Sequence, residues 1–169
     1  TNPDSAHDPK VEPKEGPGES LKVLDWLLAE GRHIRRSRDL IDALCQRLVE
    51  SGVPLWRAVV SIRTIHPQIL ATVYVWRRGE EAVVIEAGHD LLNDPAYLTS
   101  PFKVINDGAG GLRRRIEAIA GEIDFPVLNE LREQGATDYV AMPLPFVGGP
   151  IHVVAWTSDR PGGFGRRRH

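Results

Sequence analysis

The sequence contains a single cysteine, Cys45, among its 169 residues. One thiol can form neither an internal disulfide nor a paired-thiol redox centre, and it cannot supply the usual cysteine-rich zinc site. Cys45 falls on the apolar stripe of a predicted helix, where free cysteine usually packs as a small buried hydrophobe. We therefore interpret Cys45 as a core residue and not as a nucleophile.

Long apolar runs and an excess of either charge are also missing. No run approaches the roughly 20 apolar residues that cross a bilayer, and the acidic, proline-rich N-terminus does not resemble a signal peptide. The 21 lysines and arginines and the 23 acids give a formal net charge of -2, without the basic excess of typical nucleic-acid binders. The arginine runs 113–115 and 166–168 fit solvated faces. We expect a cytoplasmic protein with neither a membrane nor a nucleic-acid partner.

Motifs for catalysis and metal binding are absent as well. No two histidines have a metal-site spacing such as His-Glu-x-x-His, and the glycine-rich segment 107–111 lacks the Gly-Lys-Ser/Thr ending of a phosphate-binding loop. The sequence offers no convincing pair of nucleophile and base. We therefore expect no metal site and no enzymatic activity, and the sequence assigns no cofactor. Haem ligation by a single histidine stays open.

The two ends of the chain differ in composition from its middle. Residues 1–19 contain four prolines, two glycines and seven charged residues. Such a segment buries too little apolar surface to offset the entropy lost on ordering. We predict a disordered leader over 1–19, one folded domain over 20–165 and a basic tail over 166–169.

Helical periodicity predicts two helices at the start of the domain. Ser20 is a suitable N-cap for a helix over 21–30, and a second helix is predicted over 37–51. The apolar residues that share one face of the first helix are Leu21, Leu24 and Leu28. A further helix is expected beyond Asp124, which we interpret as its cap, with Pro126 in the first turn.

Alternation of apolar and polar residues predicts five strands, over 58–63, 69–77, 82–85, 138–144 and 151–157. Short turns between the first three indicate an antiparallel meander. The segment 112–116 fits either a strand or a helix. This order of elements predicts an α+β fold, an antiparallel sheet with helices packed on it.

A long excursion separates the third strand from the segment at 112. It runs over 86–111 and exceeds what a strand connection needs. Tyr97 and Phe102 lie at its centre, and Pro95 and Pro101 restrict its backbone. Since long loops of this kind are usually lids, binding loops or disorder, we predict that the excursion is the functional part of the domain.

Six segments resemble the N-terminal domain of alphaproteobacterial adenylate/guanylate cyclase-domain proteins: 26–28, 52–58, 63–68, 95–101, 135–141 and 159–164. The resemblance extends over about 21–164 and implies a GAF/PAS-like sheet with packed helices. That family joins this domain to a C-terminal class III nucleotide cyclase. The resemblance therefore implies a non-catalytic regulatory module, with the cyclase catalytic domain as its fused or associated partner.

The resemblance also indicates where a ligand would bind. In GAF-like folds the pocket lies between the sheet and the mid-domain excursion, which makes Tyr97, Phe102 and His89 candidate ligand-binding residues. His66 is a further candidate, although a role in shaping its turn is favoured. If 112–116 is a strand, Arg114 faces an apolar layer and needs a partner, for which a core carboxylate is favoured over an anionic ligand.

Three functions remain in competition at this point. The first is a sensor that binds a small molecule and relays its presence to a cyclase, with the chain forming a homodimer. The second is a dimerisation module without a ligand, whose N-terminal helices form the interface. The third is a small stand-alone enzyme, which would need a nucleophile–base pair.

Overall fold

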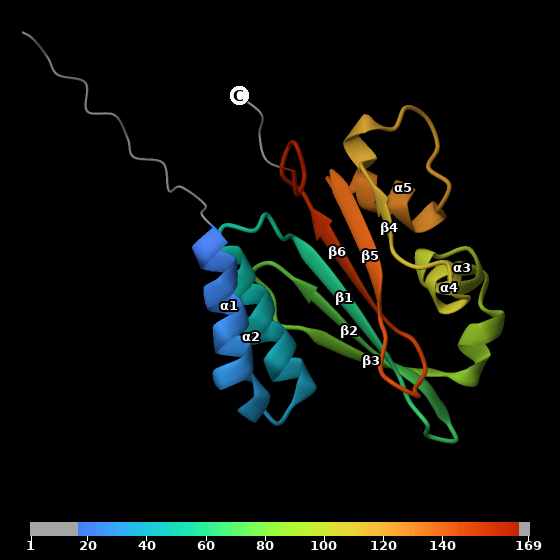
Figure 1. Ribbon diagram of the computed structural model, residues 1–169. Coiled ribbons are helices and arrows are strands. Elements are labelled where there is room, and N and C mark those ends of the chain that lie inside the picture. Colours follow the sequence, from blue (N-terminus) through green and yellow to red (C-terminus); the bar gives the residue numbers. More distant parts are fainter. Residues whose placement is uncertain (1–16, 166–169) are drawn as a thin grey trace, which may run out of the picture.

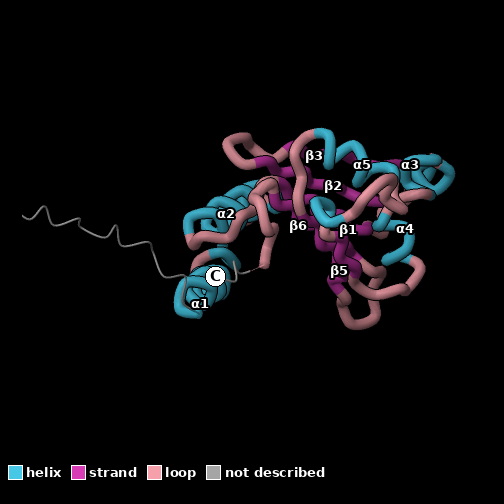
Figure 2. The backbone as a smooth tube through the Cα atoms, turned by 90° about the horizontal axis from the view of Figure 1, so that it is seen from above, coloured by secondary structure: helices cyan, strands magenta, loops and turns pink. Residues whose placement is uncertain are grey.

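The computed structural model of this chain describes residues 17–165 (Figure 1). It contains a six-stranded antiparallel sheet in the order β3-β2-β1-β6-β5-β4. Helices α1 and α2 lie on one side of the sheet and α3, α4 and α5 on the other, which is plainest in the view from above (Figure 2). The predicted α+β fold, with helices packed on an antiparallel sheet, is confirmed. The predicted leader and tail lie outside the described residues, except that 17–19 belong to α1.

The strands are β1 (Arg57–Arg63), β2 (Ile69–Arg77), β3 (Val83–Gly88), β4 (Leu112–Arg114), β5 (Asp138–Leu144) and β6 (His152–Ser158). The first three form the predicted antiparallel meander. β6 then pairs with β1, so the last strand of the chain lies at the centre of the sheet. The ambiguous segment 112–116 is a strand as far as Arg114, and a short 3-10 helix follows it.

The helices are α1 (Pro17–Ala29), α2 (Ser37–Glu50), α3 (Pro95–Leu98), α4 (Pro101–Asn106) and α5 (Pro126–Glu133), with 3-10 turns η1 (Gly31–His33), η2 (His89–Asn93) and η3 (Ile116–Ala118). The excursion is therefore largely helical rather than an open loop. Asp94 Oδ1 accepts a hydrogen bond from Ala96 N at 2.7 Å, and Ser100 Oγ accepts one from Lys103 N at 3.3 Å. These caps, each followed by a proline, begin α3 and α4.

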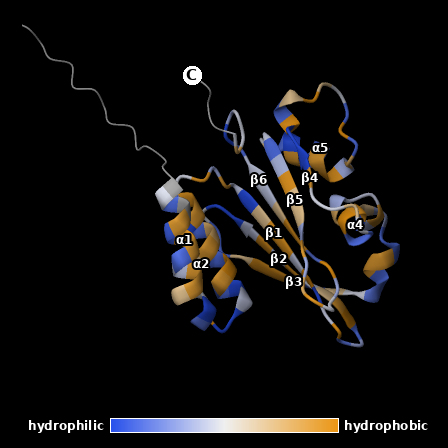
Figure 3. Cartoon of the chain, viewed as in Figure 1, coloured by the Kyte–Doolittle hydropathy of each residue, from blue (hydrophilic) through white to orange (hydrophobic). Residues whose placement is uncertain are grey.

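One core lies between α2 and the sheet. Ile41 and Cys45 of α2 are buried there against Ala58 of β1 and Trp76 of β2. Apolar residues run along both helices of this side and along the central strands (Figure 3). The predicted stripe of the second helix is therefore the face that packs on the sheet.

Helix α1 begins at Pro17, ahead of the predicted cap at Ser20. Val23 and Trp26 are its buried residues, and the guanidinium of Arg47 lies 4.3 Å from the centre of the Trp26 ring. The three leucines that share the other face are exposed, with fractions of 57% for Leu21, 48% for Leu24 and 62% for Leu28. The described part of the chain therefore leaves an apolar stripe on α1 uncovered.

A second, larger core lies on the opposite side of the sheet. Ile105 of α4, Ile116 of η3 and Leu128 of α5 are fully buried there, against the inner residues of β1, β5 and β6. The cap prediction for α5 is wrong: Phe125 occupies the N-cap position, and no side chain caps the helix. The carboxylate of Asp124 is bound by Arg114 instead.

Candidate ligand site

A cavity of about 230 Å³ lies between the sheet and the helices of the excursion. Its floor comes from β1 and β5. Its cover comes from α3 and α4 and one wall from α5, three helices that lie on the same side of the sheet (Figure 1). The residues that line it are Arg57, Val59, Ala96, Thr99, Ser100, Pro101, Phe102, Pro126, Val127, Glu130, Leu131 and Tyr139. The lining is mostly apolar, with one cation and one carboxylate, as is common in small-molecule pockets.

Arg57 supplies the cation of this cavity. It begins β1, where it lies opposite Arg77 of β2 and Thr157 of β6. Its Nε is buried and has no hydrogen-bond partner among the described residues. Burial, and then the nearby Arg77, lower the pKa of Arg57, while Tyr139 acts in the opposite direction. Since buried charges are normally paired, an arginine without a carboxylate at a cavity floor is an unusual group.

Tyr139 of β5 also lines the floor, with Thr157 of β6 between it and Arg57 in the sheet. Its ring is buried in the larger core, and burial raises the pKa of its phenol above the ordinary value. The phenol is therefore neutral at physiological pH and can donate a hydrogen bond. Arg57 and Tyr139 together give the floor two donors that can bind one acceptor.

Phe102 and Tyr97, the two aromatic candidates of the excursion, have different positions. Phe102 is partly buried, packs against the larger core and lines the cavity. Tyr97 does not line it; its hydroxyl accepts a hydrogen bond from Asn106 Nδ2 at 3.0 Å. Tyr97 therefore braces α3 against α4, and only Phe102 is placed to touch a ligand.

His66, His89 and Arg114 are not part of the cavity lining. His66 Nδ1 accepts hydrogen bonds from Gln68 N at 3.1 Å and Ile69 N at 3.3 Å, the turn-shaping contacts that the sequence favoured. His89 is exposed in η2.

Arg114 has the carboxylate partner that was favoured for it, but at the surface and not in the core. Its Nε lies 3.0 and 3.2 Å from the two oxygens of Asp124, which is 53% exposed. The guanidinium also lies 5.3 Å from the centre of the Phe125 ring. Arg114 is therefore already paired and is not a ligand-binding residue of this cavity.

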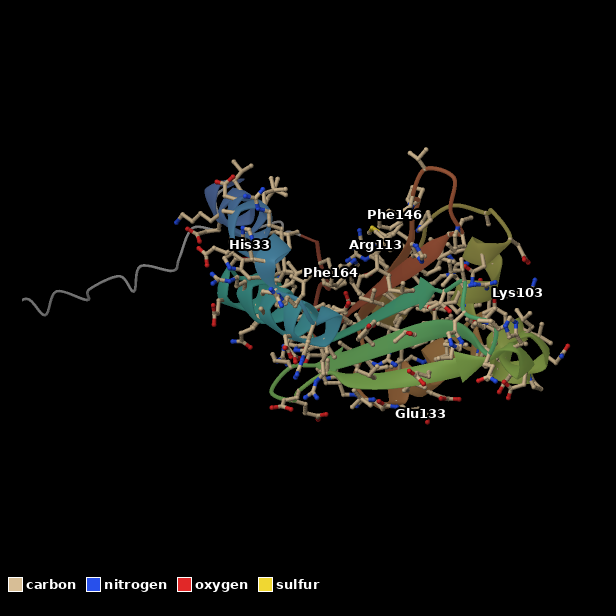
Figure 4. All side chains as sticks on the ribbon, turned by 90° about the horizontal axis from the view of Figure 1, so that it is seen from below. His33, Lys103, Arg113, Glu133, Phe146 and Phe164 are labelled. Carbon is tan, nitrogen blue, oxygen red and sulfur yellow. The ribbon has the colours of Figure 1, made fainter. Side chains whose placement is uncertain are left out.

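Arg57 was not among the predicted site residues because the predicted strand began one residue later, at 58. Extending that alternation by one residue puts Arg57 on the same face as Val59, so the signal was present. A second charged residue was not predicted either: Arg113, which binds the buried Asp138 on the side of α1 and α2. Arg113 and Phe164, which both contact Asp138, lie close together in Figure 4. That pair depends on strand register, which the sequence did not specify.

Cys45, the other candidate for chemistry, is buried in the core under α2. Burial, helped by the charge of Asp42, raises the pKa of its thiol to about 12. The thiol is therefore protonated at physiological pH and is a poor nucleophile. Over residues 17–165, no group of three or more histidine, cysteine or acidic side chains is arranged to hold a metal ion. Within the same range, no helix has the length and apolar character needed to span a bilayer.

No protein-family model matches this chain, and no curated protein is significantly similar to it. Function is therefore inferred from the residues that form the cavity.

Proposed function

We propose that this chain is a non-catalytic sensor domain of the cytoplasm. It binds a small molecule in the cavity under α3 and α4 and relays its occupancy to a class III nucleotide cyclase, fused or associated. The observation that supports this most strongly is the cavity itself, an apolar space beside an unpaired cation and beneath a cover of short helices. The sequence also resembles GAF-like domains. Because those domains bind their ligand between the sheet and the mid-domain excursion, the resemblance supports this cavity as the ligand site.

The cover is suited to respond to a ligand. Helices α3 and α4 have four and six residues, and helices of that length have little stability of their own. Their mutual contacts include the hydrogen bond from Asn106 to Tyr97 and the one from Ser100 Oγ to the Tyr97 carbonyl at 2.7 Å. A ligand that contacts Phe102 would bias the position of this cover at a small energetic cost.

The strands beneath the cavity connect it to the core under α2 on the opposite face of the sheet. Along β1, Arg57 and Val59 face the cavity while Ala58 packs in the core under α2. A displacement of β1 by the ligand would therefore change the packing of α2. Because packed cores resist continuous deformation, such a change favours two discrete arrangements that a cyclase could read.

The test is a fusion of this chain to a class III cyclase catalytic domain, assayed for cyclic nucleotide formation with and without a small-molecule cell extract. The Phe102→Ala and Tyr97→Ala variants should lose the response to extract, with circular dichroism confirming that they fold. The matched control is Leu98→Ala, because Leu98 is exposed on α3 and does not line the cavity. If both variants respond like the wild type, the excursion is only a fixed cover and the proposal fails.

A second function, a dimerisation module without a ligand, is favoured by one observation. The stripe of Leu21, Leu24 and Leu28 is exposed on α1, and apolar stripes of this kind are typical of helix pairing. Leu24→Glu tests it by sedimentation velocity. If Leu24→Glu abolishes both the dimer and cyclase output while the cavity variants change neither, this second function replaces the first.

A further inference from the structure

Among the described arginines, Arg38 and Arg57 each have a buried Nε without a hydrogen-bond partner. Arg38 nevertheless forms ion pairs with Asp42 and Glu81. No ion pair among the described residues involves Arg57, and its buried Nε has no hydrogen-bond partner. Its neighbour Arg77 adds a second positive charge; Arg77 lies over the Trp56 ring and donates to Gln134 Oε1 at 3.4 Å. Arg57 and Arg77 therefore make the floor of the cavity positive, and Glu130 of the wall is the only carboxylate among the lining residues.

A purely structural role does not account for this arginine. A structural arginine in a partly buried position normally satisfies its donors on carboxylates or carbonyl groups. An apolar side chain of similar length would fill the same space without the desolvation penalty of a charge. A charged group that is retained without a partner at a cavity marks a candidate binding group.

We propose that the ligand of this cavity is a small organic monoanion, a molecule with one acidic group and an apolar body. The guanidinium of Arg57 binds the acidic group, and the hydroxyl of Tyr139 donates a hydrogen bond to it. The apolar body lies against Phe102, Val127 and Leu131. This inference rests on the proposed function and deepens it by naming the chemical class of the ligand.

The remaining lining residues favour a ligand with one negative charge. Glu130, an exposed residue of the cavity wall, is a carboxylate and would weakly repel a second acidic group. Thr99 and Ser100 supply the other side-chain hydroxyls, and the rest of the lining is apolar. A volume of about 230 Å³ admits a molecule with a single small ring or a short branched chain. Dianions such as phosphate monoesters, and large polar ligands, fit this lining poorly.

The test compares benzoate with benzamide, its neutral counterpart of nearly the same shape. Thermal unfolding and two-dimensional NMR of the isotope-labelled chain are measured with each probe. Benzoate should raise the Tm of the wild type by several degrees and shift the backbone signals of Phe102, Val127 and Tyr139. Benzamide should produce at most a small fraction of either effect. In Arg57→Met the benzoate shift should disappear, whereas the control Arg35→Met, at an exposed position, should keep it.

Arg57→Met also has an expected effect without any probe. Since it removes an unpaired, partly buried charge and keeps an apolar chain, it should leave the Tm of the free protein unchanged or raise it. A clear fall in that Tm would show that Arg57 has a structural role and would overturn the proposal. Equal effects of benzoate and benzamide, or a benzoate shift that survives in Arg57→Met, would overturn the proposal that Arg57 binds an anionic ligand. Either result would leave the cavity as a ligand site. If neither probe shifts the NMR signals of the lining residues, the monoanion proposal fails; the proposed function fails only if Phe102→Ala and Tyr97→Ala also leave the response of the cyclase fusion to cell extract unchanged.

Discussion

The carboxylate of Asp138 accepts hydrogen bonds from Arg113 Nε at 3.1 Å and from its Nη2 at 2.5 Å, although Asp138 is only 1% exposed. The backbone N–H of Phe164 donates a third hydrogen bond to the same carboxylate at 3.0 Å. One buried acid at the start of β5 therefore joins β4 to the segment that follows β6. Its only ion-pair partner among the described residues is Arg113, so removing that guanidinium leaves a charge in the interior.

Arg113→Met should lower the free energy of unfolding by about 2–3 kcal/mol, because it leaves the Asp138 carboxylate buried without its cation. Urea denaturation followed by circular dichroism measures this. Arg115→Met is the matched control, since Arg115 is 54% exposed and lies 3.7 Å from its partner Glu117. It should change stability by no more than about 0.5 kcal/mol. Equal effects of the two variants would show that the buried carboxylate does not depend on Arg113.

Gly163→Ala should destabilise the domain because Gly163 packs directly on Asp138. A Cβ at Gly163 would lie 2.4 Å from the Cβ of Asp138, and the residue has a φ of +61°, which favours glycine. We expect a loss of at least about 1 kcal/mol in the free energy of unfolding. Gly149→Ala is the control, because its Cβ would meet only ordinary contacts at 3.8 Å. A Gly163→Ala protein as stable as the control would mean that the C-terminal segment can move away from Asp138.

Cys45 should react with a thiol reagent only when the domain unfolds. Burial raises the pKa of its thiol to about 12, so the native protein contains almost no thiolate between pH 7 and 9. Labelling with a maleimide, followed by mass spectrometry, should therefore be slow in buffer and complete in urea. The comparison is a Cys45→Ala, Ser37→Cys double variant, whose thiol lies at an exposed position and should react at once. Rapid native labelling of Cys45 would contradict the packing of α2 on the sheet.

The Arg114–Asp124 pair should make a small contribution to stability that depends on pH. The hydrogen bond from Arg114 lowers the pKa of Asp124 from its ordinary value. The contribution is therefore present above the pKa of the unfolded carboxyl and is lost as the pH falls through the lower pKa of the folded one. Because Asp124 is exposed, Arg114→Met should reduce stability at pH 7 by about 1 kcal/mol or less, with the difference disappearing in acid. A difference that stays constant down to low pH would assign the effect to packing on Phe125 alone.

Much of the fold was predictable because periodicity is strong in its longer elements. The predicted strand 69–77 coincides with β2, and the helix predicted from Ser37 coincides with α2 to within one residue. Helices α3 and α4 were missed because four to six residues are too few to show a 3.6-residue period. The cap-and-proline pairs at Asp94 and Ser100 were readable in the sequence, but Pro95 and Pro101 were interpreted only as restricting a loop backbone.

The candidate site was predicted only in outline. The excursion followed from its length, whereas the GAF-like resemblance implied the position of the pocket and made Phe102 a candidate lining residue. The exposed face of α1 was not predictable, because apolar residues occur nearly all round that helix and only packing decides which of them are buried. The face of Arg57 follows from its alternation with Val59, but its neighbour Arg77 and the contact of Arg113 with Asp138 appear only once strand register is known.

Native mass spectrometry provides the most direct test of whether this cavity holds a small molecule. The purified chain is incubated with a small-molecule cell extract, desalted and weighed under non-denaturing conditions. The wild type should carry one small-molecule increment, and Leu98→Phe, a control at an exposed position on α3, should carry it too. Ala96→Phe, which adds a ring at a lining position of the same helix, should have the bare mass. A wild type of bare mass, or an increment that survives in Ala96→Phe, would contradict the assignment of this cavity as the ligand site.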